Sequence, residues 1–338
     1  MTTYCVFDVS NLVYRIAMMT NGGRGEEEDL VNLALATSIR SMRVPFDMFG
    51  ADHAVMCFDH ASWRKAVYAK YKSSRAVAED AKPAEIELRD GIARAIDGFR
   101  EFLSENSNCT VLWARGCEAD DLIARWVARH PQATNVLVST DSDFKQLVAG
   151  QVHLYNPTSG TLYSGNGIYE SQTKKKAKRG EPTAELFGQI WRVPLGEDGK
   201  PEAFSGEWEL FKKIMLGDRS DDIDRAAPPR TLNRVLQEAF NHWGGVAWTT
   251  LMETRRADLG EAAPTVAEVY ERNRGLIDLT QLPPEVVAVA DAEIDRATGL
   301  PPKSSLGMKF MIYCRQRSMV SLGGDAERYV PMLSSHYR

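Results

Sequence analysis

Sulfur ligands for metals and disulfide pairs are scarce in this sequence. Its 338 residues include five cysteines, an odd number without a C-x-x-C pair, which argues against a disulfide framework and against a structural zinc. The six histidines provide no H-x-x-x-H or H-E-x-x-H spacing. Any metal is therefore expected to be bound by oxygen, which favours Mg²⁺, with Mn²⁺ as a substitute.

Long apolar segments are also missing. No run approaches the ~20 residues that a membrane-spanning helix needs, and residues 1–9 lead into a strand-like segment instead of a basic and then apolar signal. We therefore expect a cytoplasmic protein with no membrane partner. The net charge of -5 does not by itself suggest a nucleic-acid partner, but acids and cations are segregated into separate clusters.

Two catalytic signatures are absent as well. The glycine-rich stretch at 22–25 lacks the G-K-[S/T] of a phosphate-binding loop, which disfavours a nucleotide-triphosphate enzyme. A phosphatase with a nucleophilic aspartate on a similar sheet would need D-x-D after the first strand. Asp8-Val9-Ser10 does not supply it, so this second class of enzyme is disfavoured too.

Short apolar runs alternate with amphipathic segments through the first half of the chain. The expected strands cover residues 3–7, 54–58, 110–114 and 135–140. The expected helices cover 12–19, 30–43, 84–104, 144–148, 208–215, 232–243, 246–253, 266–279 and 283–297. Strands that alternate with helices indicate an α/β fold with a parallel sheet. In such a sheet ligands bind beyond the carboxyl ends of the strands.

Carboxylates follow each of the expected strands. They are Asp8, Asp59, Glu118 with Asp120 and Asp121, and Asp141 with Asp143; a later cluster adds Asp218 and Asp221. Two-metal phosphoryl transfer needs such clustering, because two divalent ions ~3.5 to 4 Å apart activate a water and stabilise the leaving oxygen. These acids could instead be separate helix caps and surface groups, each stabilised by ~0.3 to 1 kcal/mol in a first helical turn. That explanation does not account for the repeated order of strand and acid.

Five motifs together carry a specific resemblance. They are Phe7-Asp8-Val9-Ser10-Asn11-Leu12 with Arg15, Phe58-Asp59, Glu118-Ala119-Asp120-Asp121, Thr140-Asp141-Ser142-Asp143, and Gly217-Asp218-Arg219-Ser220-Asp221-Asp222. Their order and approximate spacing resemble those of the structure-specific 5'-nuclease family, which comprises flap endonucleases and 5'-3' exonucleases. The motifs cover residues 1 to about 225. The size and arrangement are most similar to the bacteriophage RNase H and flap endonuclease type, which removes RNA primers and flaps.

The resemblance implies a fold and a division of the chain. An α/β core with a parallel, PIN-like sheet would cover residues 1–205, with a basic helical arch at about 61–83 and a basic loop at about 157–182, whose composition indicates an exposed loop or hairpin. A mostly helical region at 206–338 would bind duplex and complete the site with Asp218 and Asp221. A further loop is expected at 195–205, and another at 21–28.

The resemblance also implies a metal-dependent nuclease that hydrolyses 5' flaps, nicked duplexes or RNA primers during DNA replication or repair. Asp8, Asp59, Glu118, Asp120 and Asp141 would bind the first of two Mg²⁺ ions, directly or through water. Asp121, Asp143, Asp218 and Asp221 would serve the second ion. The alternative is a non-catalytic structure-specific DNA-binding protein on the same scaffold, which would lack some of these carboxylates. No expected motif acid is missing from the sequence.

The implied partners are branched or nicked duplex DNA and RNA-DNA hybrids with a free 5' end. Recruitment by a replication clamp or a single-strand-binding protein is left open by the sequence, and the enzyme is expected to act as a monomer. If the source is a bacteriophage, its location would be the cytoplasm of the host cell.

Cations and aromatic residues are interleaved directly after Asp59. Residues 63–75 contain five cations and three aromatics, and in one continuous helix Lys65, Tyr68, Lys72 and Arg75 would share a side suited to phosphates and bases. A solvated basic helix is the other interpretation. Tyr71, Lys72 and Arg75 resemble the family's Tyr-Lys-x-x-Arg motif, which implies that Lys72 and Arg75 stabilise charge at the scissile phosphate while Tyr71 stacks on terminal bases. The expected nucleic-acid contacts here are Arg64, Lys65, Tyr68, Lys70, Tyr71, Lys72 and Arg75.

The sequence departs from the family after the last acidic motif. The family usually has a glycine-rich hairpin there, which grips the duplex and often holds a monovalent cation. Residues 223–230 contain no glycine, so a K⁺ site is not expected and the duplex contact would come from Arg225, Arg230 and Arg234. The run Lys174 to Arg179 has no motif support, and we expect it to contact DNA weakly or not at all.

Overall fold

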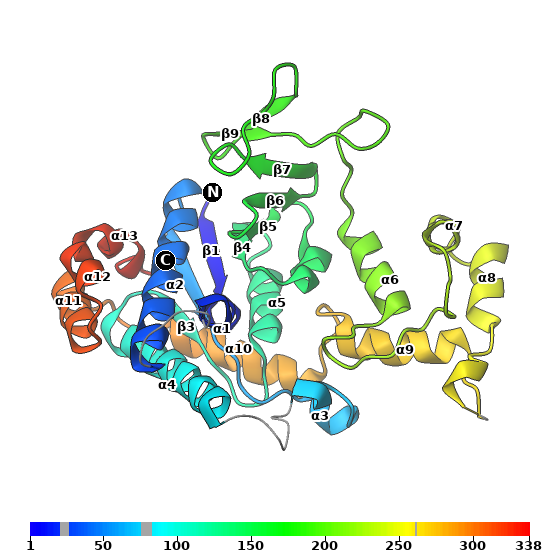
Figure 1. Cartoon of the computed structure of the whole chain (residues 1–338), viewed down its shortest axis with the longest axis horizontal. Coiled ribbons are helices and arrows are strands. Elements are labelled where there is room, and N and C mark those ends of the chain that lie inside the picture. Colours follow the sequence, from blue (N-terminus) through cyan, green and yellow to red (C-terminus); the bar gives the residue numbers. More distant parts are fainter. Residues whose placement is uncertain (21–26, 76–82, 261) are drawn as a thin grey trace.

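A nine-stranded sheet forms the centre of the protein (Figure 1), which is described by a computed structural model over residues 1–20, 27–75, 83–260 and 262–338. The strand order is β3-β2-β1-β4-β5-β6-β7-β9-β8. The parallel strands are β1 (Thr3–Asp8), β2 (His53–Cys57), β3 (Thr110–Leu112), β4 (Thr134–Val138) and β5 (Val152–Asn156). The predicted α/β class, the parallel sheet and its first four strands are confirmed.

Four antiparallel strands extend the sheet beyond β5. They are β6 (Thr161–Ser164), β7 (Gly167–Ser171), β8 (Thr183–Leu186) and β9 (Gln189–Arg192). Of the loop or hairpin expected over residues 157–182, the first part is a hairpin formed by β6 and β7. Every second residue of β7 is buried, as in a half-buried strand, although the segment is rich in glycine and serine. The basic run Lys174 to Arg179 lies in the connection from β7 to β8 and is largely exposed.

Helices cover both faces of the sheet because alternate strand residues point to opposite sides. Cys5 and Phe7 of β1 enter one apolar core, whereas Tyr4 and Val6 enter the other. The first face is covered by α1 (Val9–Thr20), α2 (Glu27–Met48), α4 (Pro83–Asn106), α11 (Leu306–Gln316), α12 (Val320–Gly324), the 3-10 helix η4 (Ala326–Tyr329) and α13 (Val330–Leu333). The second face is covered by α5 (Ala119–Arg129) and α10 (Pro284–Thr298). The predicted loop at 21–28 ends inside α2, and its first six residues, 21–26, lie outside the described residues.

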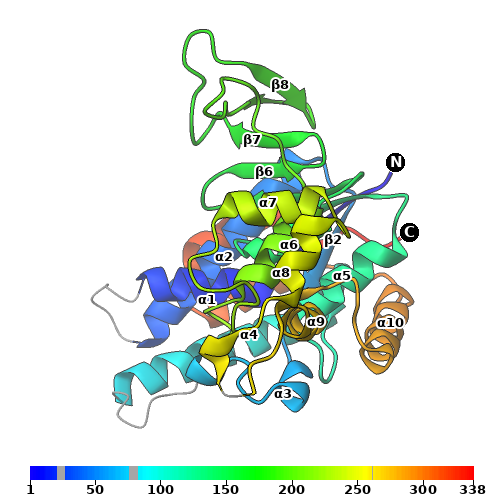
Figure 2. The ribbon, with the colours of Figure 1, turned by 90° about the vertical axis from the view of Figure 1, so that its right-hand side faces the viewer.

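A helical arm projects to one side of the sheet in Figure 1, faces the viewer in Figure 2, and has its own apolar core. It consists of α6 (Gly206–Leu216), α7 (Asn233–Asn241), α8 (Val246–Glu253), the 3-10 helix η3 (Ala257–Leu259) and α9 (Val266–Ile277). Phe211, Met215 and Val269 are buried in this core. The helices predicted after residue 206 are confirmed. Of the helices that follow the arm, α10 to α13 pack against the sheet and not against the arm, so the division of the chain into two regions at residue 205 stays a prediction. In the described part of the chain, no helix has the length and apolar character to cross a membrane.

The basic segment after Asp59 is not one helix. It contains α3 (Arg64–Val67), an extended Tyr68 and the 3-10 helix η1 (Ser73–Arg75), and Lys72 has a left-handed backbone with φ 51°. The expectation that Lys65, Tyr68, Lys72 and Arg75 share one helical side is therefore wrong. Residues 76–82 of the predicted arch lie outside the described residues.

Candidate active site

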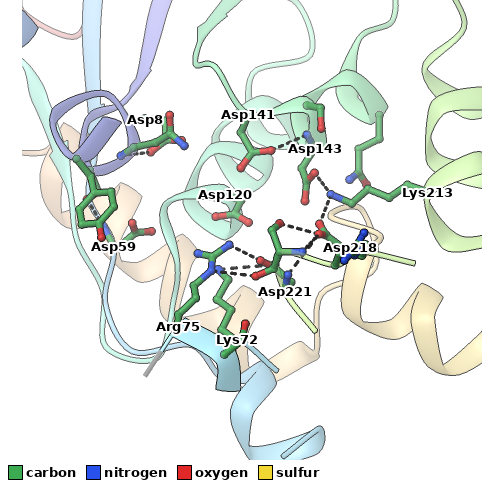
Figure 3. A pocket seen from close by; sticks show the side chains of 18 of the residues that line it. Asp8, Asp59, Lys72, Arg75, Asp120, Asp141, Asp143, Lys213, Asp218 and Asp221 are labelled. Carbon is green, nitrogen blue, oxygen red and sulfur yellow. Dashed lines mark hydrogen bonds and ion pairs between the residues drawn. The ribbon is translucent and has the colours of Figure 1, made fainter. Parts of the chain in front are cut away.

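A cavity of about 1080 Å³ opens at the carboxyl ends of β1 and β4 (Figure 3). Its walls bring together Asp8, Asp59, Asp120, Asp141, Asp143, Asp218 and Asp221 with Lys72 and Arg75. Asp8 ends β1, Asp141 follows β4 at the start of the 3-10 helix η2 (Ser142–Leu147), and Asp218 and Asp221 follow α6. Seen from close by, Asp120 and Asp141 lie between the pair Asp8 and Asp59 and the group around Asp218. The expected convergence of strand ends is thus present.

Backbone N-H groups fix three of the carboxylates. Asp8 accepts from the N-H of Asn11 at 3.2 Å, Asp59 from the N-H of Ala119 at 2.8 Å, and Asp141 from the N-H of Asp143 at 2.9 Å. These N-H groups lie at helix starts, which favour negative charge. These acids can therefore stabilise helix starts and form a metal site at once, because the same hydrogen bonds hold them around the cavity.

Asp120 is the carboxylate with the least support. Within the described residues its side chain has no hydrogen-bond or ion-pair partner, and burial, with repulsion from Glu118, raises its pKa to about 8. Burial and the charges of Asp59, Asp120 and Asp141 likewise raise the pKa of Asp8. Such mutual repulsion is relieved by a cation, and an all-oxygen donor set suits Mg²⁺ or Mn²⁺.

The carboxylates of the cavity do not converge on one common position for a metal ion. In the described ranges, no three His, Cys, Asp or Glu side chains are close enough to hold a metal ion as they stand. A cation held by three of them would need the side chains to draw together. The donors in the cavity are carboxylate oxygens, and their chemistry fits such an ion.

Three cations pair with the acids on one side of the cavity. Lys213 contacts Asp143 and lies 2.7 Å from an Asp218 oxygen. Burial acts to raise the pKa of Asp218, but Lys213 and Ser220 lower it to about 2. Arg75 Nη2 lies 2.5 Å from Asp221 Oδ1, and Lys72 Nζ lies 3.8 Å from the other oxygen of Asp221. The acids on this side of the cavity therefore have cationic partners, whereas burial and mutual repulsion raise the pKa values of Asp8 and Asp120.

Sequence reasoning missed Lys213. It lies at the end of a predicted helix and five residues before Asp218, so the signal was a cation one turn ahead of an acidic cluster. Charges of that kind are common on helix surfaces, and only the tertiary fold brings Asp143 to the same ammonium group.

The structure does not place Glu118 and Asp121 on the cavity wall. Glu118 is buried and accepts from Ser62 at 2.5 Å, Arg64 at 2.8 Å, Tyr71 at 3.1 Å and Lys72 at 2.5 Å. Asp121 is fully buried, pairs with Arg64 at 2.9 Å and accepts from the N-H of Glu118 at 2.9 Å. With their oxygens saturated by donors, the structure does not support these two as metal ligands. Glu118 instead holds Lys72 at the edge of the cavity.

Two residues predicted to contact nucleic acid are buried. Arg64 is 2% exposed and donates to Glu118, to Asp121 and, at 2.8 Å, to the carbonyl of Leu276. Tyr71 is 2% exposed, so its ring is not open to a base. The structure corrects both predictions, because these side chains anchor the basic segment to α5 and α9.

The remaining predicted contacts lie outside the cavity wall, and their roles stay predictions. Lys65, Lys70, Arg230 and Arg234 are exposed, Tyr68 and Arg225 are half-buried. Tyr68 donates to Asp224 at 3.3 Å, and Lys70 lies 3.5 Å from the same carboxylate.

Gly217 fixes the loop that carries Asp218 and Asp221. Its φ of 69° and ψ of -173° suit only glycine, and an added Cβ would lie 2.4 Å from the carbonyl oxygen of Ile223. Gly217→Ala is expected to lower stability by at least ~2 kcal/mol and to reduce turnover by ~100-fold through displaced carboxylates. Thermal melting measures the first effect, and cleavage of a 5'-flap duplex, the activity that the sequence resemblance implies, measures the second. Gly244→Ala is the matched control, since Gly244 has φ 75° but open space around its Cβ; equal losses in both variants would contradict this role.

Asp120 also predicts a pH dependence. Its raised pKa means that the folded protein holds a proton which the unfolded chain releases near pH ~4, so the metal-free protein loses stability as the pH rises from about 4 to about 8. A divalent cation such as Mg²⁺ would bind the ionised form, so the rise in melting temperature on adding Mg²⁺ should be greater at about pH 8 than at about pH 5.5. Each kcal/mol of binding corresponds to roughly 2 to 4 °C. A larger effect of Mg²⁺ at the lower pH would contradict this assignment.

Residues 3–189, more than half of the chain, match the family described as 5'-3' exonuclease, N-terminal resolvase-like domain. The chain therefore belongs to the 5'-3' exonuclease family, which confirms the resemblance seen in the sequence. Flap endonuclease Xni of Psychromonas ingrahamii is 29% identical over 160 residues, 46% of this chain and 56% of that protein. DNA polymerase I of Rhizobium leguminosarum is 35% identical over 109 residues, 31% of this chain and 10% of that protein. The chain thus spans about half the length of the flap endonuclease it matches.

Solved structures share the fold. A bacteriophage T5 flap endonuclease, in a pseudo-enzyme-product complex with DNA and metal ions, has a TM-score of 0.60 at 16% identity and covers 87% of this chain and 97% of its own. T5 5'-exonuclease with bound zinc ions has a TM-score of 0.58 at 16% identity, with coverages of 87% and 98%.

Proposed function

We propose that this protein is a divalent-metal-dependent, structure-specific 5'-nuclease that acts as a 5'-3' exonuclease and flap endonuclease. The observation that carries the proposal is that carboxylates from β1, α5, the end of β4 and the loop after α6 line the same cavity as Lys72 and Arg75. Family membership and the flap endonuclease relatives support it. The metal-bound structures of T5 nucleases support a divalent cation, which we take to be Mg²⁺.

Divalent ions in this cavity would supply an ionised water and neutralise the leaving oxygen. Asp8, Asp59, Asp120 and Asp141 would hold one ion, and Asp143, Asp218 and Asp221 the other. Lys213 competes for Asp143 and Asp218, so it would have to leave these carboxylates or share them. The protein itself would position the metal-binding acids next to the scissile phosphate, because N-H groups at helix starts fix these acids in place.

Lys72 and Arg75 would stabilise negative charge on the phosphate in the transition state. Lys72 is tied to buried Glu118, and Arg75 to Asp221, so both cations are held at the cavity before substrate arrives. Preorganised charge of this kind acts without reorganisation during the reaction. The strained backbone of Lys72, with φ 51°, agrees with a functional position.

The proposed substrates are 5' flaps, nicked duplexes and RNA primers on DNA. The T5 flap endonuclease complex with DNA supports DNA as the ligand, and the flap endonuclease relatives support a flap as the substrate. Recruitment by a replication clamp or a single-strand-binding protein, a monomeric state and a cytoplasmic location are further parts of the proposal.

A substrate panel tests it. A 5' flap, a nicked duplex, a 3' flap and a single strand of the same sequence, each labelled, are incubated with the protein and Mg²⁺. We expect cleavage at the 5' flap junction and at the nick, and little at the 3' flap or the single strand. Equal cleavage of all four would overturn structure specificity, and binding of the flap without cleavage would support the non-catalytic alternative.

A further inference from the structure

The turn at residues 224–227, which directly follows the loop that carries Asp218 and Asp221, has an unusual set of hydrogen-bond partners. Side chains donate to four consecutive carbonyls: Asn273 to Asp224 at 2.7 Å, Arg256 to Arg225 and, at 2.7 Å, to Ala226, and Arg225 to Ala227 at 2.9 Å. Backbone carbonyls in loops usually bind water or neighbouring N-H groups. Here side chains of the protein donate hydrogen bonds to all four carbonyls of residues 224–227.

Arg256 is central to this arrangement. It is 2% exposed, which is costly for a charge unless it is fully paired. Asp258 pairs with it through two bonds, of 2.8 Å to Nε and 2.6 Å to Nη2, while Nη1 donates to the two carbonyls. Because a guanidinium stays charged at all accessible pH values, the carbonyls face a permanent positive charge.

The turn joins the cavity to exposed cations. On its near side, Asp218 and Ile223 exchange backbone hydrogen bonds of 2.9 and 2.8 Å, which closes the loop that carries Asp218 and Asp221. On its far side lie Arg230, exposed with φ 64°, and exposed Arg234. The position of the turn therefore sets the distance between the cavity and these cations.

We propose that Arg256 is a positioning residue for duplex binding: its guanidinium takes the place of a bound monovalent cation at the carbonyls of residues 225 and 226. The inference rests on the proposed nuclease function for its ligand, the phosphate backbone of a duplex. A carbonyl run without such a charge would attract K⁺ or Na⁺, since these cations bind oxygen dipoles. With Arg256 in place, the turn keeps its shape whatever monovalent cation is present.

The test measures the Kd of a labelled, nicked 5'-flap duplex in chelator, so that no cleavage occurs. K⁺, Na⁺ and tetramethylammonium are compared at equal ionic strength, because tetramethylammonium is too large to bind between carbonyls. We expect the wild type to bind equally in all three salts, within about twofold. Arg256→Met should bind at least about tenfold more weakly in tetramethylammonium and recover part of that loss in K⁺.

Arg255→Met is the matched control, since Arg255 is exposed and donates to the carbonyl of Ala263, outside the turn. It should bind like the wild type in every salt. If Arg256→Met fails to fold, Asp258→Asn loosens the guanidinium while keeping it, and should show the same K⁺ dependence in weaker form.

A rate measurement separates positioning from catalysis. Single-turnover cleavage of saturating substrate by Arg256→Met in K⁺ should stay within about threefold of the wild type. Wild-type binding that requires K⁺, or an Arg256→Met variant whose binding is weaker by the same factor in all salts, would overturn the inference. Absence of cleavage by the wild type would overturn the nuclease proposal alone, since the binding assay needs no cleavage.

Discussion

Asp120→Asn is expected to abolish cleavage of a 5'-flap duplex and to raise the melting temperature of the metal-free protein at about pH 8. Asp120 has no partner in the described structure, and burial raises its pKa to about 8. An amide removes the repulsion but is a poor ligand for a hard cation. We expect the rate to fall by ~1,000-fold or more, with binding of the flap largely intact. The melting temperature should rise by roughly 2 to 4 °C for each kcal/mol of repulsion removed.

This opposite movement of stability and activity distinguishes a ligand site from a structural cap. Asp141→Asn should lose activity to a similar extent, but its stability gain should be smaller because Asp141 accepts a hydrogen bond from the N-H of Asp143. Asp90→Asn on the exposed side of α4 is the control and should change neither quantity. Undiminished turnover by both Asp120→Asn and Asp141→Asn would remove these residues from the site.

Lys72→Ala is expected to reduce the single-turnover rate at saturating substrate by ~100 to 1,000-fold while changing the Kd for the duplex only a few-fold. Lys72 is held by a 2.5 Å contact with buried Glu118 and lines the cavity, so in the proposed mechanism its charge would lie near the reacting phosphate. A group that acts mainly in the transition state changes kcat more than binding.

Lys70→Ala is the comparison, because Lys70 is exposed in the same segment and its ammonium group lies 3.5 Å from the carboxylate of Asp224, outside the cavity wall. Its loss should weaken binding, with a shallower salt dependence, and leave the rate of bound substrate unchanged. A Lys72→Ala effect confined to affinity would make Lys72 a simple phosphate contact.

The sequence predicted the framework of this site because two local signals agreed. Apolar runs of strand length located β1 to β4, and an acid after each run was bound to meet the others once the strands were parallel. That rule placed Asp8, Asp59, the cluster of Glu118, Asp120 and Asp121, and Asp141 with Asp143 at one site, and all of them except Glu118 and Asp121 line the cavity. Asp218 and Asp221 came from a later motif, and the fold of α6 brings them to the same cavity.

The errors arose where burial depends on tertiary contacts. Arg64 and Lys65 are adjacent cations in the sequence, yet Arg64 is buried against Glu118 and Asp121 while Lys65 is exposed. Tyr71 looked like a stacking residue, but its hydroxyl reaches Glu118. Nothing in the local pattern distinguishes a phosphate contact from an internal ion pair, since both need the same side chain.

Composition left the segment of the antiparallel strands β6 and β7 open between a loop and a hairpin. Their glycine, serine and threonine content is typical of loops, and their stability comes from pairing with β5 and with each other. Lys213 was missed because its partner Asp143 is 70 residues away in the chain.

The most direct test of the nuclease assignment is single-turnover cleavage of a labelled 5'-flap duplex by the wild-type protein, with Mg²⁺ and with a chelator. The carboxylate cavity predicts cleavage near the flap junction with Mg²⁺, a 5'-phosphate on the trimmed strand, and no cleavage in chelator, with activity restored when Mg²⁺ or Mn²⁺ is added back. Cleavage that persists in chelator, or tight binding without cleavage in Mg²⁺, would contradict a metal-dependent nuclease centre at this cavity.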